Sequence, residues 1–280
     1  MSVQREPGTG MRDIGEARAL PRLCSLWVGD RLGYLEQLCL RSARSVGHEV
    51  TLYSYEPERL CGVPDAIELR DAREVMPESE LVAHGGNGSY ALGADFFRYA
   101  LLAKGLGIWT DMDVVFVKPI DFNEEYLFGW QDAALINGAI LSFPKDSPLA
   151  CELANVRKMT GRPPWYGPKR TMKYFWSRLR DGELSVEDMP WGTFGPEMIT
   201  YLAKKHEVSG RAQDPEVFYP LHWKDARKLY GPAELVESII RPETRAIHLW
   251  NGALYGLRDK PPPKGSFIAD QCLRHDIATD

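Results

Sequence analysis

The sequence predicts an α/β fold in which helices flank a mainly parallel central sheet, and two observations carry this prediction. The first is a strand–helix–strand segment over residues 23–55, whose length is that of a right-handed crossover between parallel strands. The second is the nearly continuous apolar run at residues 114–117, which is typical of a strand covered on both faces. Ligands of such open sheets bind at the carboxyl ends of the strands, so functional residues are expected there.

Composition places the chain among ordinary globular proteins, with 44% hydrophobic and 26% charged residues and a net charge of −5. No block of Lys or Arg stands out, so nucleic acid is not expected as a partner. The five cysteines are far apart and lack metal-ligand spacing, which indicates reduced thiols in a reducing compartment. No window reaches the roughly 18 apolar residues of a membrane span. We therefore expect a cytoplasmic protein.

The expected organisation is one domain over residues 21–258. Residues 1–20 are charged, lack the apolar segment of a signal peptide, and are predicted to be a disordered lead-in in which Met11 is an alternative start. Residues 259–280 contain a proline run and are expected to form a C-terminal tail.

The first elements of the domain follow from hydrophobic periodicity. Residues 34–46 place apolar side chains at helical spacing and are followed by Gly47, which predicts an amphipathic helix. The neighbouring elements are shorter: strands are expected at residues 23–28, 50–55 and 66–69, and a short helix at residues 71–76.

Residues 93–120 combine a helix, a tight glycine turn and a buried strand. The helix is predicted over residues 93–104, and Gly105 and Gly107 end it. In the strand that follows, Asp111 and Asp113 are two residues apart and are expected to point to the same face. Because two carboxylates in apolar surroundings are costly to bury without a cation, we expect a divalent metal ion beside them.

Asp95 and Arg98 are three residues apart near the start of that helix, so they share one of its faces. An arginine at a helix N-terminus suits an anion such as a phosphate. A carboxylate beside it suits sugar hydroxyls. We therefore expect both side chains to face the same cleft as the aspartate pair.

The second half of the chain offers two further candidate residues. Residues 133–143 predict an apolar strand broken at Asn137-Gly138, where Asn-Gly is a strong hairpin signal. Residues 147–159 predict a helix, and residues 245–251 predict the last strand, which carries His248. A histidine at a strand end is usually a core residue, yet imidazole also suits Mn²⁺-like ions, and the aspartate pair still needs ligands.

Residues 169–180 form a basic, aromatic stretch of helical periodicity. The favoured interpretation is a surface helix whose inward residues are Met172, Phe175, Trp176 and Leu179. The alternative is a patch that attracts anionic lipid headgroups or an anionic acceptor.

One combination of these residues resembles a known family. The pattern resembles that of the sugar transferases with a DXD motif, and it consists of Asp95-x-x-Arg98, Gly107, Trp109, Asp111-Met112-Asp113 and Pro119. This family includes the initiating α-mannosyltransferases of fungi, the lactosylceramide α-galactosyltransferases and bacterial capsule and lipopolysaccharide enzymes. The DxD tripeptide alone is a weak signal, whereas its combination with Asp-x-x-Arg at this spacing is specific.

The resemblance implies a GT-A fold, Rossmann-like, with a smaller acceptor-side subregion. The donor half would span about residues 21–145 and the acceptor-side half about residues 146–258. It further implies a metal-dependent, retaining hexosyltransferase that uses a nucleotide-diphosphate sugar, with UDP favoured over GDP. The acceptor would be a saccharide or glycolipid in surface polysaccharide or glycolipid synthesis. We expect a bacterial type of enzyme, with peripheral contact at the inner membrane face.

The resemblance also implies roles for individual residues. Trp27 would pack against the nucleotide base, although a core tryptophan at a strand end is the competing interpretation. Asp95 and Arg98 would fix the sugar ring, and Asn137 would border the sugar site. Mn²⁺ or Mg²⁺ would be held by Asp113 and His248, with Asp111 assisting through water or binding hydroxyls.

Two other functions compete with this interpretation. A non-catalytic module that binds nucleotide sugars or glycans would use the same pocket but would catalyse no transfer. A phosphatase with an aspartate nucleophile also carries Asp-x-Asp after a strand, but normally on the first strand and with a small residue where this chain has Val115.

Overall fold

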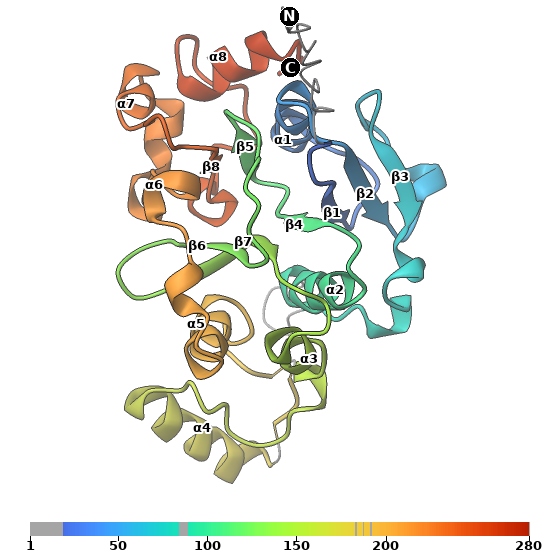
Figure 1. The fold of residues 1–280 in the computed structure, drawn as a ribbon, viewed down its shortest axis with the longest axis vertical. Helices are drawn as coiled ribbons and strands as arrows, with labels where there is room; N and C mark the ends of the chain where they lie inside the picture. Colours follow the sequence, from blue (N-terminus) through green and yellow to red (C-terminus); the bar gives the residue numbers. More distant parts are fainter. Residues whose placement is uncertain (1–18, 84–88, 183, 187, 191, 280) are drawn as a thin grey trace, which may run out of the picture.

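The computed structural model describes residues 19–83, 89–182, 184–186, 188–190 and 192–279. Nearly all of the expected lead-in, including Met11, lies outside the described residues. The structure is an α/β fold built on a six-stranded sheet of order β3-β2-β1-β4-β7-β6 (Figure 1). The fold class predicted from the sequence is confirmed.

The central sheet is parallel on one side and antiparallel on the other. The parallel side pairs β1 (Leu23–Trp27) with both β2 (Val50–Ser54) and β4 (Ile108–Thr110), and β3 (Glu68–Asp71) extends it beyond β2. Antiparallel pairing then adds β7 (Ile136–Ser142) to β4, and β6 (Leu127–Trp130) to β7. The strand order reverses next to β1, which is the place where open α/β sheets bind ligands.

A second, two-stranded sheet stands beside the first. It pairs β5 (Val114–Phe116) antiparallel with β8 (Ala246–His248), with Val114 opposite His248. This register brings a residue near the C-terminus of the chain next to the segment that follows β4. A side chain of α1 secures β5, because the Ser42 hydroxyl accepts a hydrogen bond of 3.0 Å from the Phe116 amide.

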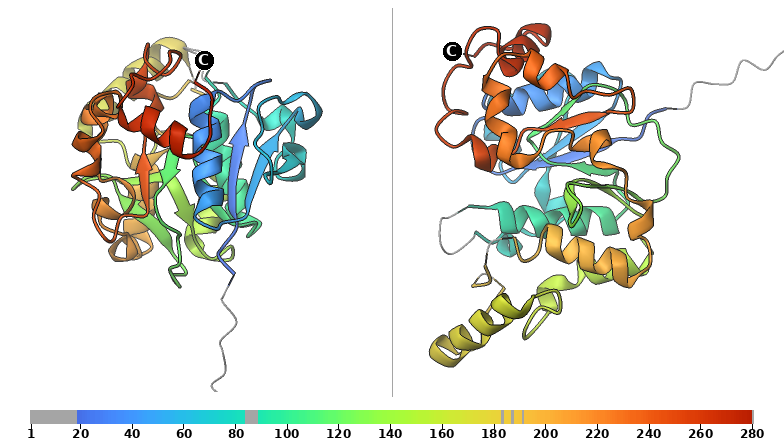
Figure 2. Two further views of the ribbon diagram at one scale, coloured as in Figure 1. Left: turned by 90° about the horizontal axis from the view of Figure 1, so that it is seen from above. Right: turned by 90° about the vertical axis from the view of Figure 1, so that its left-hand side faces the viewer.

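Helices cover both faces of the central sheet, as Figure 2 shows. One face is covered by α1 (Tyr34–Ser45), whose buried Leu35 and Leu38 share a core with β5, β8 and α8 (Phe267–Arg274). The other face is covered by α2 (Ala91–Ala103), whose Phe97 packs in a core with Trp109 of β4.

The remaining helices lie in the second half of the chain. They are α3 (Pro148–Ala154), α4 (Pro168–Asp181), α5 (Pro196–Lys205), α6 (Pro215–Phe218) and α7 (Glu234–Glu237). Short 3₁₀ helices connect the elements at Pro57–Arg59, Ala72–Glu74, Glu78–Glu80, Val156–Lys158, Ser209–Arg211, Trp223–Tyr230 and Asn251–Leu254. No helix in the described ranges combines the length and the apolar character that crossing a bilayer requires.

Three local predictions were wrong. β7 runs without a break through Asn137-Gly138, because the chain reverses earlier, after Trp130, where the Asp132 carboxylate accepts hydrogen bonds from the amides of Ala134 and Leu135. The predicted helix over residues 147–159 is divided into α3 and a 3₁₀ turn. The third error concerns α4, whose supposedly inward residues Met172, Phe175, Trp176 and Leu179 are all exposed.

Gly107 lies where the segment before β4 passes close to the segment before β1. Its φ is +148°, and a Cβ added to it would lie 2.7 Å from the carbonyl oxygen of Arg22. The close approach allows the neighbouring Ile108 amide to donate a hydrogen bond of 2.9 Å to that same oxygen. The glycine therefore sets how closely β4, and the aspartates after it, lie against β1.

We predict that Gly107→Ala lowers the free energy of unfolding by about 1–3 kcal/mol, because it introduces both backbone strain and a steric overlap. Chemical denaturation monitored by circular dichroism measures this loss. Gly210→Ala is the matched control, since a Cβ there meets nothing within 4 Å, and we expect it to change stability by less than about 0.5 kcal/mol. Equal effects of the two variants would contradict the role assigned to Gly107.

Candidate active site

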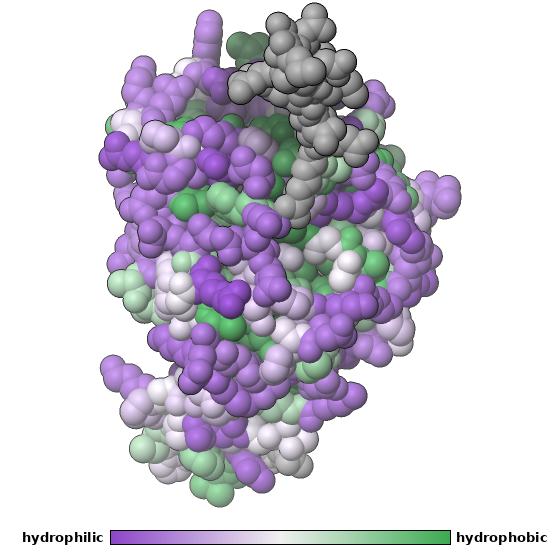
Figure 3. Space-filling view, in the orientation of Figure 1, coloured by the Kyte–Doolittle hydropathy of each residue, from purple (hydrophilic) through white to green (hydrophobic). Residues whose placement is uncertain are grey.

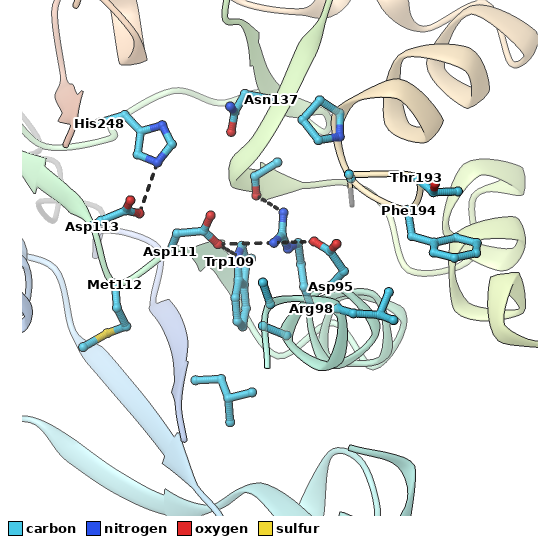
Figure 4. A pocket seen from close by; sticks show the side chains of 18 of the residues that line it. Asp95, Arg98, Trp109, Asp111, Met112, Asp113, Asn137, Thr193, Phe194 and His248 are labelled. Atoms are coloured by element: carbon cyan, nitrogen blue, oxygen red, sulfur yellow. Dashed lines mark hydrogen bonds and ion pairs between the residues drawn. The ribbon is translucent and has the colours of Figure 1, made fainter. Parts of the chain in front are cut away.

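A cavity of about 330 Å³ opens at the carboxyl ends of β1 and β4. Its walls come from β1, α2, the turn after β4, β7, the loop before α5, and the end of β8, and Figure 4 shows its polar side chains converging. All seven candidate residues predicted from the sequence line this cavity: Trp27, Asp95, Arg98, Asp111, Asp113, Asn137 and His248.

The aspartate pair is placed differently from the prediction. Asp111 and Asp113 do not lie within a strand, because β4 ends at Thr110 and β5 begins at Val114. The tripeptide is a turn that connects the two sheets, so the alternation of strand side chains does not orient the two carboxylates. The Asp111 amide donates to the Ala139 carbonyl oxygen at 2.8 Å, whereas the Asp113 carbonyl oxygen accepts from the Leu249 amide at 2.8 Å.

Asp113 is held by the last strand and the residues after it. Its Oδ1 lies 3.1 Å from Nε2 of His248, and its Oδ2 accepts a hydrogen bond of 2.9 Å from the Asn251 amide. The His248 ring in turn lies against Trp250, with the ring centroids 4.0 Å apart. Trp250 has a left-handed backbone, with φ 59°, at the point where the chain leaves β8.

The structure brings three possible metal ligands together. One ligand atom each of Asp111, Asp113 and His248 lies within 4.8 Å of the others. Nδ1 of His248 is buried and has no hydrogen-bond partner in the described part of the chain, so the contact of Nε2 with the Asp113 carboxylate is what favours one tautomer of the ring there. Two carboxylate oxygens and an imidazole nitrogen form a donor set that suits Mn²⁺ or Mg²⁺ with water completing the shell. The residues therefore fit a divalent cation.

A buried arginine lies on the other side of Asp111. Nη2 of Arg98 is 2.8 Å from Oδ1 of Asp95 and 3.4 Å from Oδ1 of Asp111, and its Nη1 donates to the Gly138 carbonyl oxygen at 2.8 Å. The indole of Trp109 donates a further hydrogen bond of 2.6 Å to Oδ1 of Asp111. The predicted convergence of Asp95 and Arg98 on the aspartate pair is thus observed (Figure 4).

Burial and pairing affect the three carboxyl groups differently. Burial raises the pKa of Asp95 to about 7, even though the Arg98 guanidinium acts in the opposite direction. Burial also raises the pKa of Asp111, again against Arg98. At Asp113 burial is outweighed by the charge and hydrogen bond of His248 and by the Asn251 amide, so its pKa is lowered. Burial and the nearby Asp111 carboxylate together outweigh the guanidinium, so Asp95 retains a proton more readily than an ordinary aspartate.

Trp27 and Asn137 both line the cavity, but they differ in how many of their polar atoms already have hydrogen-bond partners. The Trp27 indole ends β1, is half-buried, and its Nε1 has no hydrogen-bond partner within the described residues. The Asn137 amide is largely engaged, because its Oδ1 accepts from the Ala139 amide and its Nδ2 donates to Gln131, both at 2.7 Å. One hydrogen of its amide group therefore remains for a ligand.

Sequence reasoning missed the groups that support these side chains. The loop before α5 closes one side of the cavity, and the Tyr99 hydroxyl holds it by donating to the Phe194 carbonyl oxygen at 2.6 Å. Gly138 was interpreted only as a turn residue, yet a Cβ there would overlap the Arg98 guanidinium and lie 2.8 Å from Cδ1 of Ile199. No local sequence signal marks these contacts, since each joins segments far apart in the chain.

Comparisons with known proteins indicate similarity to glycosyltransferases. Residues 173–264 match the sequence model of a family described as "Alpha 1,4-glycosyltransferase conserved region". The mouse lactosylceramide 4-alpha-galactosyltransferase is 27% identical over 172 residues, which are 56% of this chain and 40% of the mouse protein. The human protein of the same name is 26% identical over 179 residues, which are 59% of this chain and 43% of the human protein.

These matches confirm the resemblance to glycosyltransferases with a DXD motif. The matched segment spans less than half of the length of the mouse and human relatives. The relatives are mammalian proteins, so the comparisons give no support to the expected bacterial type.

We predict that Gly138→Ala displaces the Arg98 guanidinium and lowers the free energy of unfolding by about 1–3 kcal/mol, as expected for overpacking in a filled site. Differential scanning calorimetry measures the loss. Gly252→Ala is the control, because a Cβ there meets nothing within 4 Å. The double variant Gly138→Ala/Arg98→Ala should lose less free energy of unfolding than the two single variants lose together. An equal or larger loss would show that the proposed overlap is wrong.

A second prediction concerns pH. The raised pKa of Asp95 means that the folded state binds more protons at this group than the unfolded state between about pH 4 and pH 7. Its contribution to stability is therefore present at low pH and is lost as the pH rises towards about 7. The Asp95→Asn variant cannot titrate at this position and lacks this pH dependence. The free energy of unfolding of the wild type relative to the variant should therefore fall as the pH rises across that range. Urea titrations at several pH values test this, and a relative stability that rises with pH would show that the pKa is depressed instead.

Proposed function

We propose that this chain, a relative of the α1,4-glycosyltransferase family, is a metal-dependent glycosyltransferase. It would move a hexose from a nucleotide-diphosphate sugar to a saccharide or glycolipid acceptor. One observation carries the proposal: the Asp111–Asp113–His248 cluster and the Asp95–Arg98 pair face one cavity at the strand-order reversal of an open α/β sheet.

The donor would enter between β1 and the turn after β4. Trp27 lies at the carboxyl end of β1 with its indole on the cavity wall, which suits stacking on a nucleotide base. Gly29 leaves room for the Trp27 indole, because a Cβ on Gly29 would lie 3.1 Å from Nε1 of Trp27. UDP is the favoured nucleotide, on the strength of the family resemblance alone.

Asp113 and His248, with Asp111, would hold Mn²⁺ or Mg²⁺ against the donor diphosphate. When bound, such an ion supplies Lewis-acid stabilisation of the leaving nucleoside diphosphate. The protein's part is to keep the three ligands in place, and it does so through the Asn251 amide on Asp113 and the Trp109 indole on Asp111.

Asp95 and Arg98 would orient the sugar ring. Arg98 donates a hydrogen bond to Oδ1 of Asp95. The other carboxylate oxygen, Oδ2, faces Gly195 across the cavity. A carboxyl group of raised pKa can either donate to or accept from a sugar hydroxyl, depending on its proton. We assign no residue as a covalent nucleophile, and retention of configuration rests on the resemblance.

Galactose is the first sugar to test, and a galactose-terminated glycolipid the first acceptor, because the relatives are named for that reaction. The competing phosphatase is disfavoured, because the aspartate pair follows β4 and not the first strand. A module that only binds nucleotide sugars would fill the same cavity, and turnover separates it from the enzyme.

We predict that the purified protein releases the nucleoside diphosphate, UDP or GDP, from one of a panel of UDP- and GDP-sugars in the presence of Mn²⁺ and an acceptor, and that a chelator abolishes this release. Asp113→Asn should lower the rate by about 100-fold or more, since several kcal/mol of transition-state stabilisation depend on the ion. Asp225→Asn, at an exposed ion pair with Lys228, is the matched control and should leave the rate unchanged.

Mn²⁺ titration calorimetry complements the rate measurement. The wild type should bind the ion in the presence of UDP, and Asp113→Asn should bind it at least about tenfold more weakly. Full activity of Asp113→Asn, or full activity in chelator, would refute the metal assignment. Donor binding without any turnover would favour the binding module.

A further inference from the structure

Helix α4 buries almost none of its surface. Of its 14 residues only Tyr174 is buried, at 4% exposure. Figure 2 shows the helix extending away from the body of the molecule at the end opposite to α8. Its four large apolar side chains are exposed to water, with exposed fractions of 62% for Met172, 52% for Phe175, 65% for Trp176 and 79% for Leu179.

These four residues form one continuous strip, which we call the α4 apolar stripe. They are spaced by three, one and three residues, so at about 100° per residue they cover a single face of the helix. The opposite face holds the helix to the protein: the Tyr174 ring packs edge-on against Tyr166, and Arg170 pairs with Glu197. The stripe therefore faces away from the protein, and Figure 3 shows hydrophobic surface at this end.

Basic side chains border the stripe on both sides. Lys169, Lys173 and Arg180 follow one edge and Arg178 the other, and all four are exposed. Lys169, Lys173 and Arg178 form no ion pair with any residue that the structure describes, and Arg180 pairs only with the adjacent Asp181. The helix carries five basic residues and one acidic residue, whereas the whole chain has a net charge of −5.

We propose that α4 docks on an anionic lipid surface. An apolar strip that contains tryptophan and phenylalanine, flanked by exposed lysines and arginines, is the arrangement of an interfacial amphipathic helix. The stripe would insert among the upper acyl carbons, Trp176 would lie at the headgroup level, and the basic residues would contact lipid phosphates. The lipid-binding alternative considered from the sequence is thus favoured over the inward-facing one.

A second copy of this chain fits the stripe less well. Two α4 helices related by a twofold axis would bring their basic edges together, and like charges at a close interface oppose association. Anionic phosphates complement both edges at once. Charge complementarity therefore selects the lipid surface as the occupant.

Docking through α4 would place the membrane beside the cavity. Tyr166, which packs on Tyr174, hydrogen-bonds at 2.8 Å with the hydroxyl of Thr193, and Thr193 lines the cavity. A lipid-linked acceptor would then meet the site from the surface on which the helix lies. The lipid-docking inference itself does not depend on the proposed reaction, because it rests on α4 alone.

Vesicle co-sedimentation tests the proposal with the full chain and without donor, metal ion or acceptor. We expect binding to vesicles that contain phosphatidylglycerol, and at least about tenfold weaker binding to phosphatidylcholine alone or in high salt. Phe175→Ser/Trp176→Ser should lose binding, and Lys169→Glu/Lys173→Glu should weaken it. The matched control, Trp223→Ser/Leu273→Ser, removes two exposed apolar side chains elsewhere and should bind as the wild type does.

Several outcomes would overturn the proposal. These are absence of binding to anionic vesicles, equal binding to neutral vesicles, and unchanged binding of Phe175→Ser/Trp176→Ser. A wild-type dimer in analytical ultracentrifugation that this variant abolishes, without vesicle binding, would assign the stripe to a second copy instead. The thermal unfolding temperature and the release of UDP from a donor in solution should be unchanged in the stripe variants. These two controls separate a failure of the lipid-docking proposal from a failure of the proposed reaction.

Discussion

The buried guanidinium of Arg98 holds together three parts of the structure that are distant in sequence. It comes from α2, binds the carbonyl oxygen of Gly138 in β7, and lies within 3.4 Å of the first aspartate of the turn after β4. A charge with 8% of its side chain exposed is stable only when its partners are in place, so the site residues and the packing of α2 on the sheet depend on each other. Loss of either carboxylate partner would leave a buried charge poorly compensated.

The position of the aspartate turn between two sheets gives the site its second constraint. Asp111 is fixed to the central sheet through Ala139 and Trp109, and Asp113 is fixed to the small sheet through Leu249 and Asn251. The distance between the two carboxylates therefore depends on how the sheets lie relative to each other. Ser42 of α1, which accepts from the Phe116 amide, helps to set that relation from the outside of the site.

The sequence predicted those features that local patterns encode. The helices α1 and α2, the strands β1 and β2, and the convergence of the seven candidate residues on one cavity followed from periodicity, turn residues and the family resemblance. The support of Asp113 by Asn251 and the need for glycine at 138 could not be predicted, because both arise from contacts between residues about 140 or 40 positions apart. The inward face of α4 was predicted wrongly, since periodicity shows that a helix has an apolar face and not what that face contacts.

The fit between Gly138 and Arg98 also restricts how this site can change over evolutionary time. While the guanidinium keeps the position that it has in this structure, any side chain larger than hydrogen at position 138 overlaps it. A larger residue at position 138 would therefore push the guanidinium away from the partners it has in this structure, so a substitution at 138 costs more while position 98 is an arginine. The residues tolerated at positions 98 and 138 are thereby coupled, although the two positions are 40 residues apart in the chain.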